Sequence, residues 1–337
     1  MCDHSPGMTD ARPSLDFATD AALHVVRLGG RAAASVDVVD DVVHRIFEGS
    51  SGFLSIEIGA SSAEDAPLVH RVVSLVRDRR AASGRSASVL VRAPFAIVTP
   101  ALARALSVAK VPVRARLSGA PTEAEVRSLR DVHAAVSASG TPPLLASFIA
   151  EIPVNEGCFE IGAGLLVDRC LDAGLSFFEL VRDEEGMDAA RHREFALAVT
   201  RHLLDRHEKG RLLVEMSLAL HLETLALQGD PRRGGPRPEP RKTIWTPDGQ
   251  PLSEPAEGFG EGCAPCRYDP YCGRGLLRDR LENLPDRREG TAYCARSKAM
   301  FEIVTALSAS PDQARVRSMF RLWWAAHKKV AAHLASA

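Results

Sequence analysis

The chain has 337 residues, of which 45% are hydrophobic and 25% are charged, as is usual for a soluble globular protein. Its formal net charge of -1 creates no overall field for nucleic acid or an anionic membrane, and no apolar run approaches the roughly 18 residues of a membrane span. The N-terminus lacks the basic and apolar regions of a secretory signal. We therefore expect a cytoplasmic protein in a reducing compartment, with neither nucleic acid nor membrane as a partner.

Strand-like and helix-like segments alternate through residues 21–228, after a mobile polar tail over residues 1–20. Ser35 can cap the first helix, and Thr122 with Glu125 forms the capping-box pattern of another. Strands are expected over 23–28, 53–58, 88–92, 112–117, 144–149 and 175–181. Helices are expected after Ser35 and over 66–80, 100–108, 122–139, 161–173, 188–207 and 212–227.

Six strand–helix units in series predict a parallel sheet with helices packed outside it. Six units are fewer than the eight of a closed barrel, so the sequence favours an α/β fold with a partial (β/α)6 TIM-like barrel. A doubly wound sheet is the alternative. The glycines Gly29-Gly30 and those between Gly157 and Gly164 lack the spacing of a dinucleotide-binding fingerprint and are interpreted as turn residues.

The composition changes at Gly229. Proline, glycine and arginine dominate residues 229–242, which predicts a linker without regular structure. Residues 243–252 then predict a β-hairpin with Asp248-Gly249 in its tight turn. Helices are expected over 298–307 and 314–334, so residues 243–337 would form a small cysteine-rich domain with C-terminal helices.

Four of the seven cysteines fall within this last domain, at Cys263, Cys266, Cys272 and Cys294. A CxxC pair places two thiolates on one turn, where they can bind one metal centre that later cysteines close. Four sulfurs suit either tetrahedral zinc or an iron–sulfur cluster, and the chemistry alone favours zinc. Buried structural thiols or two disulfides are the alternatives.

The order of these features resembles that of radical SAM (S-adenosylmethionine) proteins with a C-terminal SPASM domain, which mature peptides and proteins. The resemblance lies in the Trp-Thr-Pro-Asp-Gly-Gln hairpin at 245–250, the CxxCx5C spacing and the distant cysteine. Residues 266–273 and 293–301 are most similar to maturases of His-Xaa-Ser peptide-modification systems. The resemblance implies one auxiliary 4Fe–4S cluster, with zinc as the alternative, on Cys263, Cys266, Cys272 and Cys294.

The sequence departs from this family where the reaction takes place. Radical SAM chemistry needs CxxxCxxC just after the first strand, to hold the cluster that chelates SAM. Residues 29–35 contain no cysteine, and none lies between Cys2 and Cys158. The family's Gly-Gly-Glu-Pro after the second strand, which helps hold the SAM amino group, appears as Gly-Ala-Ser-Ser at 59–62. Because both changes affect the same ligand, these departures from the family imply a degenerate protein that has lost the reductive cleavage of SAM, and we do not expect it to bind SAM. Cys158 is interpreted as a buried core cysteine.

Charged residues lie near the C-terminal ends of the predicted strands, where function is located in parallel barrels. Such groups are costly to bury unless they are paired. They therefore either line a polar pocket for a peptide or a residual cofactor, or pair with one another as a remnant core. The residues are Glu57, Arg92, Arg116, Glu151 and Glu179.

Three functions are compatible with these features. The first is a degenerate radical SAM/SPASM-like protein that binds or scaffolds a peptide or protein substrate in RiPP-type maturation, beside an active radical SAM maturase. The second is an active peptide-modifying enzyme or electron-transfer subunit that uses the auxiliary cluster. The third is a zinc-stabilised binding module. A ligand set that is intact at one end of the chain and missing at the other favours the first.

Overall fold

The computed structural model describes residues 22–29, 34–50, 53–138, 148–182, 189–209, 213–215 and 241–253, with Glu302, Ala314, Arg315 and Ser318. The strands are β1 (Ala22–Arg27), β2 (Leu54–Gly59), β3 (Ala87–Pro94), β4 (Val113–Arg116), β5 (Phe148–Val154), β6 (Phe177–Arg182), β7 (Val214–Glu215), β8 (Arg241–Trp245) and β9 (Pro251–Ser253). The helices are α1 (Val36–Gly49), α2 (Ala66–Ser83), α3 (Pro100–Val108), α4 (Glu123–Ser137), α5 (Glu156–Asp172) and α6 (Ala189–Glu208), with short 3-10 turns η1 (Ala63–Asp65) and η2 (Phe95–Ile97).

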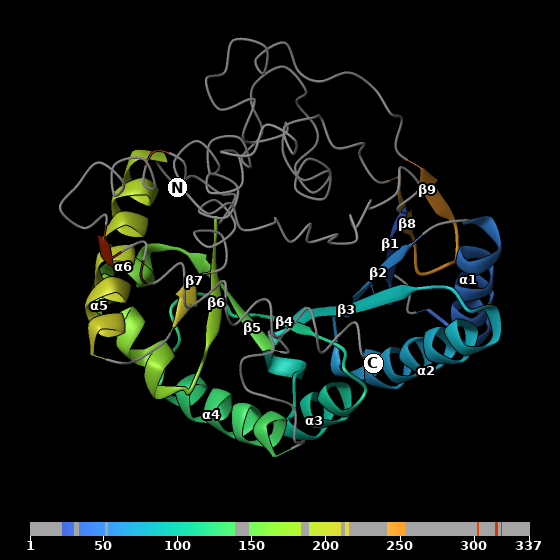
Figure 1. The fold of residues 1–337 in the computed structure, drawn as a ribbon, viewed down its shortest axis with the longest axis horizontal. Coiled ribbons are helices and arrows are strands. Elements are labelled where there is room, and N and C mark those ends of the chain that lie inside the picture. Colours follow the sequence, from blue (N-terminus) through green and yellow to red (C-terminus); the bar gives the residue numbers. More distant parts are fainter. Residues whose placement is uncertain are drawn as a thin grey trace, which may run out of the picture.

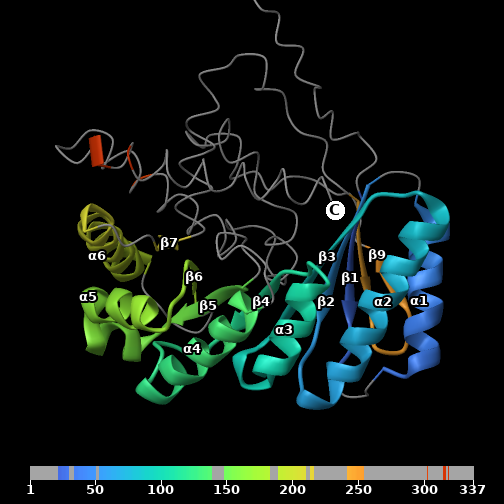
Figure 2. The ribbon, with the colours of Figure 1, turned by 60° about the horizontal axis from the view of Figure 1, so that its bottom comes forward.

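All nine strands form one sheet in the order β7-β6-β5-β4-β3-β2-β1-β8-β9. Every neighbouring pair is parallel except β8 with β9. From β1 to β7 the strands lie side by side in chain order, and the sheet curves so that α1 to α6 follow one another around its convex face (Figure 1). A second view shows the same one-sided layering (Figure 2). Helices on one face agree with the predicted barrel-like arrangement and not with a doubly wound sheet.

Several helix starts are formed by the side chains that the sequence predicts. The hydroxyl of Ser35 accepts a hydrogen bond from the Val38 N–H at 3.3 Å at the start of α1. At α4, the Glu125 N–H donates to the Thr122 hydroxyl at 3.2 Å, and the Thr122 N–H donates to the Glu125 carboxylate at 2.8 Å. These bonds satisfy N–H groups that have no partner within the helix.

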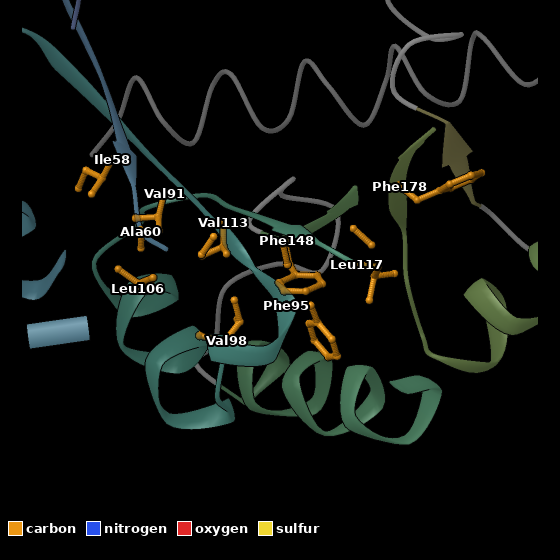
Figure 3. Packing of buried hydrophobic residues seen from close by; sticks show 14 of the residues in the cluster. Ile58, Ala60, Val91, Phe95, Val98, Leu106, Val113, Leu117, Phe148 and Phe178 are labelled. Atoms are coloured by element: carbon orange, nitrogen blue, oxygen red, sulfur yellow. The ribbon is translucent and has the colours of Figure 1, made fainter. Parts of the chain in front are cut away.

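The hydrophobic core lies between the sheet and the helices. In β5 the alternate residues Phe148, Ala150, Ile152 and Val154 all belong to it, because side chains of a strand alternate between the two faces of the sheet. Each fully buried large apolar side chain contributes about 1.5–3 kcal/mol. Figure 3 shows core side chains of this layer, among them Val91, Phe95, Leu106, Val113 and Phe148. The remaining strand positions face the concave side of the sheet.

Residues 212–227 were predicted to form a helix, and this is wrong at Val214–Glu215. These two residues form β7, which pairs in parallel with β6 through Phe177 and Phe178. Both β7 residues are buried. Pairing with a sheet edge has outweighed the helical pattern here, since the preference for a strand depends strongly on tertiary context.

Helix α5 begins earlier than its predicted start at residue 161. The Asn155 side chain accepts a hydrogen bond from the Cys158 N–H at 3.4 Å and so caps the helix at Glu156. Gly162 interrupts α5 with φ of 76°, a left-handed value that favours glycine. The glycines between 157 and 164 therefore lie within a kinked helix and not in turns. Strand β5 extends to Val154, beyond its predicted end at Ile149.

The predicted hairpin is confirmed, and it joins the main sheet. Gly249 has φ of 78° in the turn, and its N–H donates to the Thr246 carbonyl at 2.9 Å. β8 pairs in parallel with β1, from Ala22 opposite Arg241 to Val26 opposite Trp245. The hairpin thus extends the sheet on the side of β1 opposite to β2.

The four cysteines of the predicted cluster site, the tail over 1–20 and residues 229–240 of the predicted linker lie outside the described residues. Glu302 and Arg315, beyond the cysteines, form ion pairs with α6. None of the described helices combines the length and the apolar character that a membrane span requires.

Candidate functional site

Five charged side chains from consecutive strands β2 to β6 meet on the concave face of the sheet. We call Glu57, Arg92, Arg114, Glu151 and Glu179 the glutamate–arginine network. Arg92 donates from Nε to Glu151 at 2.9 Å and lies 3.9 Å from Glu57. Arg114 lies 2.6 Å from Glu179 and 3.4 Å from Glu151. The contacts therefore run continuously from β2 to β6.

Glu151 is the central member of this network. Its side chain is 0% exposed, whereas those of Arg92 and Arg114 are 19% and 16% exposed. A carboxylate so deeply buried is tolerated because a guanidinium lies on either side of it. The network has three carboxylates and two guanidinium groups, so it presents hydrogen-bonding groups to the concave face while its charges largely compensate one another.

Four of the five residues predicted for this face belong to the network, and the fifth does not. Arg116, the predicted residue, is exposed and lies outside the network. Arg114, two residues earlier on β4, takes part in the network instead. The two arginines alternate with the buried Val113 and Ala115, so both face the concave side. The sequence shows that the two arginines share one face of the strand. It does not show which of them takes part in the network and which is exposed.

Glu215 is a further buried carboxylate that the sequence analysis missed. It lies on β7 beside β6, and its carboxylate accepts a hydrogen bond from the Leu180 N–H at 3.0 Å. The helical interpretation of residues 212–227 concealed it. A strand interpretation of that segment would have placed this glutamate next to the edge of the sheet.

The connection from β1 to α1 occupies the place where a radical SAM protein carries its catalytic cysteines. The Ala34 N–H donates to the Leu28 carbonyl at 2.9 Å, so only residues 29–33 lie between these two bonded residues. The Gly29 Cα packs so closely that an added Cβ would lie 1.7 Å from the Ser61 hydroxyl and 2.8 Å from an Asp65 carboxylate oxygen. The connection is therefore short, and its first residue, Gly29, lies against the residues that follow β2.

Asp65 holds Ser61 and Ser62, the residues that follow β2, through hydrogen bonds to its side chain. Its carboxylate is 2% exposed and accepts hydrogen bonds from the Ser61 N–H at 2.7 Å, the Ser61 hydroxyl at 3.1 Å and the Ser62 N–H at 2.9 Å. These donors stabilise a buried negative charge. The backbone N–H groups at this strand end are thus engaged within the chain itself.

The residues at the end of β1 do not fit a SAM-binding 4Fe–4S cluster. The eight-residue CxxxCxxC motif is longer than the five-residue span between Leu28 and Ala34, and this span contains no cysteine. Cluster binding also requires thiolates, and the nearby donors are the oxygens of Ser61 and Asp65, which bond to each other.

The described cysteines behave as core residues. Cys158 and Cys170 are both fully buried and are not in a disulfide. Burial raises the pKa of the Cys158 thiol and raises that of Cys170 to about 12, which keeps both protonated. This confirms the interpretation of Cys158 as a buried thiol. Within the described ranges, no group of three or more His, Cys, Asp and Glu side chains could hold a metal ion.

Neither a family model nor a curated protein matches this sequence. Solved structures of anSMEcpe, an anaerobic sulfatase-maturating radical SAM enzyme, resemble it in fold. The structure with bound AdoMet and Cp18Cys peptide has a TM-score of 0.64 at 12% identity, covering 90% of this chain and 99% of that chain. The structure with bound AdoMet has a TM-score of 0.63 at 12% identity, covering 89% and 100%. The chain therefore has a radical SAM-type fold, with a mostly parallel α/β sheet.

Proposed function

We propose that this chain is a degenerate radical SAM/SPASM-like protein, which binds a peptide or protein substrate in RiPP-type maturation without cleaving SAM. In this proposal β1 to α6 are a partial (β/α)6 barrel, and an active radical SAM maturase is the partner that carries out the chemistry. The observation that carries the proposal is the short connection after β1, which lacks cysteines and whose Gly29 packs against Ser61 and Asp65. The neighbouring structure with bound peptide supports a peptide as the ligand class.

The proposal includes one auxiliary 4Fe–4S cluster on Cys263, Cys266, Cys272 and Cys294. Four thiolates with a CxxC pair are a suitable donor set for it. Such a cluster would supply one-electron transfer or a fixed anchor for the surrounding chain. The protein's own part would be to hold the substrate on the concave face, where Arg92 and Glu151 already form a fixed polar surface.

Metal analysis tests the cluster. The full chain is purified anaerobically, and iron, sulfide and zinc are measured per chain with the visible spectrum. We expect about four irons and four sulfides, which are lost in Cys266→Ala and retained in the matched variant Cys170→Ala. One zinc without sulfide would contradict the cluster and favour a zinc-stabilised binding module.

SAM cleavage tests the degenerate character. The reduced protein is incubated with SAM and dithionite, and deoxyadenosine is measured by mass spectrometry. We expect none above the protein-free control, because the end of β1 has no thiolate to hold the cluster. Catalytic formation of deoxyadenosine by the chain alone would overturn the proposal and favour the active-enzyme alternative.

A further inference from the structure

Two arginines on the concave face stand outside the glutamate–arginine network. Arg27 ends β1 and Arg116 ends β4, and both side chains are exposed. Arg27 alternates with the core residues Val26 and Leu28, and Arg116 alternates with Ala115 and Leu117, so both face away from the helices. Among the described residues, neither guanidinium has an ion pair or a hydrogen bond. Two cations without a partner in the described part of the chain therefore lie at the strand ends where parallel sheets place their ligands.

The sheet register fixes the separation of the two arginines. Arg27 pairs with Gly59, Gly59 with Arg92, and Arg92 with Arg114, so one row crosses β1 to β4. Arg116 lies two residues further along β4. Three strand spacings of about 4.8 Å and two residues of about 3.3 Å give about 16 Å between the two Cα atoms in a flat sheet, and curvature of the sheet shortens this.

The surface between the two arginines is held in place by the glutamate–arginine network. Arg92 and Arg114 are fixed by their contacts with Glu151 and Glu179. Gly59 has no side chain, and a Cβ added there would meet its nearest neighbours at 3.8 to 4.0 Å, which is ordinary contact. A ligand that crosses this row therefore meets the fixed side chains of Arg92 and Arg114, and beside Arg27 it meets Gly59, which projects no side chain.

We propose that Arg27 and Arg116 bind two carboxylates of an extended acidic peptide, carried by side chains four residues apart. In an extended chain, residues i and i+4 point to the same side and lie about 14 Å apart, which two flexible arginine side chains can span. Residues i and i+3 point to opposite sides and cannot both reach the sheet. This inference rests on the proposed function and specifies which peptides the concave face selects.

The test compares three labelled peptides that share one strand-forming sequence. The first has glutamates at positions 3 and 7, the second at positions 3 and 6, and the third has glutamines at 3 and 7. Fluorescence anisotropy with the anaerobically purified full chain gives their Kd values. We expect the 3,7 peptide to bind about tenfold more tightly than the 3,6 peptide, because only one carboxylate of the latter reaches an arginine. The advantage should fall in high salt.

Two variants complete the test. The double change Arg27→Gln and Arg116→Gln should abolish the tenfold preference, and both residues are exposed, so the fold should tolerate them. Arg104→Gln removes the same type of charge from an exposed position on α3 and should leave the preference unchanged. Circular dichroism confirms that all variants are folded.

Equal binding of the two acidic peptides, or a preference that survives in the double variant, would overturn this inference. If all three peptides bind with the same Kd, the chain binds peptides but does not select for an acidic motif. Absence of binding by all three peptides also overturns the inference. The proposed function is judged separately, by iron content and deoxyadenosine formation, which involve none of these peptides.

Discussion

Glu151 shows how a single residue organises the concave face. Its carboxylate is buried between Arg92 and Arg114, which come from the two strands that precede β5 in the sheet. Removing one partner of a buried ion pair leaves an uncompensated charge, which costs more than the intact pair contributes. The stability of this face therefore depends on the residues that touch Glu151, such as Arg114, while the exposed Arg116 on the same strand as Arg114 contributes little.

The two arginines of β4 allow a direct comparison. We expect Arg114→Gln to lower the free energy of unfolding by about 2 kcal/mol or more, because Glu151 and Glu179 lose a partner. Arg116→Gln should change it by less than about 0.5 kcal/mol, because this side chain is exposed and unpaired in the described structure. Urea unfolding measures both. Equal effects of the two substitutions would contradict the network.

His24 should make stability depend on pH. Its ring is 6% exposed, Nδ1 accepts a hydrogen bond from the Trp245 Nε1–H at 3.3 Å, and Nε2 lies 3.2 Å from the Ser50 hydroxyl. Burial lowers the pKa of His24 from 6.5 to about 4. The unfolded chain therefore takes up the proton first, and stability falls as the pH drops from about 6.5 to about 4, by up to about 3 kcal/mol.

The comparison that isolates this residue is urea unfolding of the wild type and His24→Gln between pH 7 and pH 4.5. Other groups also titrate in this range, so the difference between the two proteins is the informative quantity. The variant should lose less stability on acidification. His44→Gln is the control, because His44 is partly exposed beside Glu48. Identical pH dependence in wild type and His24→Gln would show that His24 is not held neutral.

At the scale of elements, the loop after β4 packs closely against the residue that caps α5. The Asn155 side chain caps α5 and also donates to the Ser118 carbonyl at 3.1 Å. Gly119 lies so close that a Cβ added there would be 2.4 Å from the Asn155 side-chain nitrogen. Because Asn155 is held by two hydrogen bonds, it cannot easily move aside, and this loop requires glycine for steric reasons.

A double-mutant cycle tests this fit. Gly119→Ala should cost about 1–3 kcal/mol through the clash with Asn155, and Asn155→Ala should cost about 1 kcal/mol through the lost cap. The combined variant should be more stable than the sum of the two losses predicts, since alanine at 155 removes the clash. Urea unfolding of the three variants gives the coupling energy. Additive losses would contradict the direct contact.

At the scale of the molecule, the described parts of the C-terminal region contact both ends of the sheet. The β8–β9 hairpin extends it beside β1, and Trp245 lies under Arg45 of α1, with 4.5 Å between the guanidinium carbon and the ring centroid. Glu302 and Arg315 pair with Arg193 and Asp205 of α6, at the other end of the sheet (Figure 1). The segment with the four predicted ligands is thus connected to opposite ends of one core.

Loss of the proposed cluster should therefore leave the sheet folded. The described core is formed by β1 to β6, β8 and α1 to α6, and it includes none of the four predicted ligands. We expect Cys266→Ala, or chelation of iron, to remove the visible absorption and to shift the main unfolding transition by less than about 1 kcal/mol. Circular dichroism and urea unfolding measure this. Collapse of the sheet on metal loss would show that the cluster supports the core.

The sequence by itself determined the local structure of most elements and the character of the concave face. Caps such as Ser35 and Thr122, and the periodic apolar residues of α1 to α6, depend on near neighbours in the chain, so they could be predicted from it. The position of Glu57, Arg92, Glu151 and Glu179 near the C-terminal ends of the strands also indicated that they belong to one polar face.

Only the tertiary structure decided which of these charges meet. Arg116 is the residue opposite Glu151 in the sheet register, yet Arg114 is the arginine whose side chain contacts Glu151 and Glu179. Strand β7 forms because β6 offers it an edge to pair with. The parallel pairing of β8 with β1 joins residues more than two hundred positions apart. The packing of Gly29 against Ser61 and Asp65 likewise joins two separate loops. Contacts of this kind depend on how distant segments are brought together, which no local pattern of residues encodes.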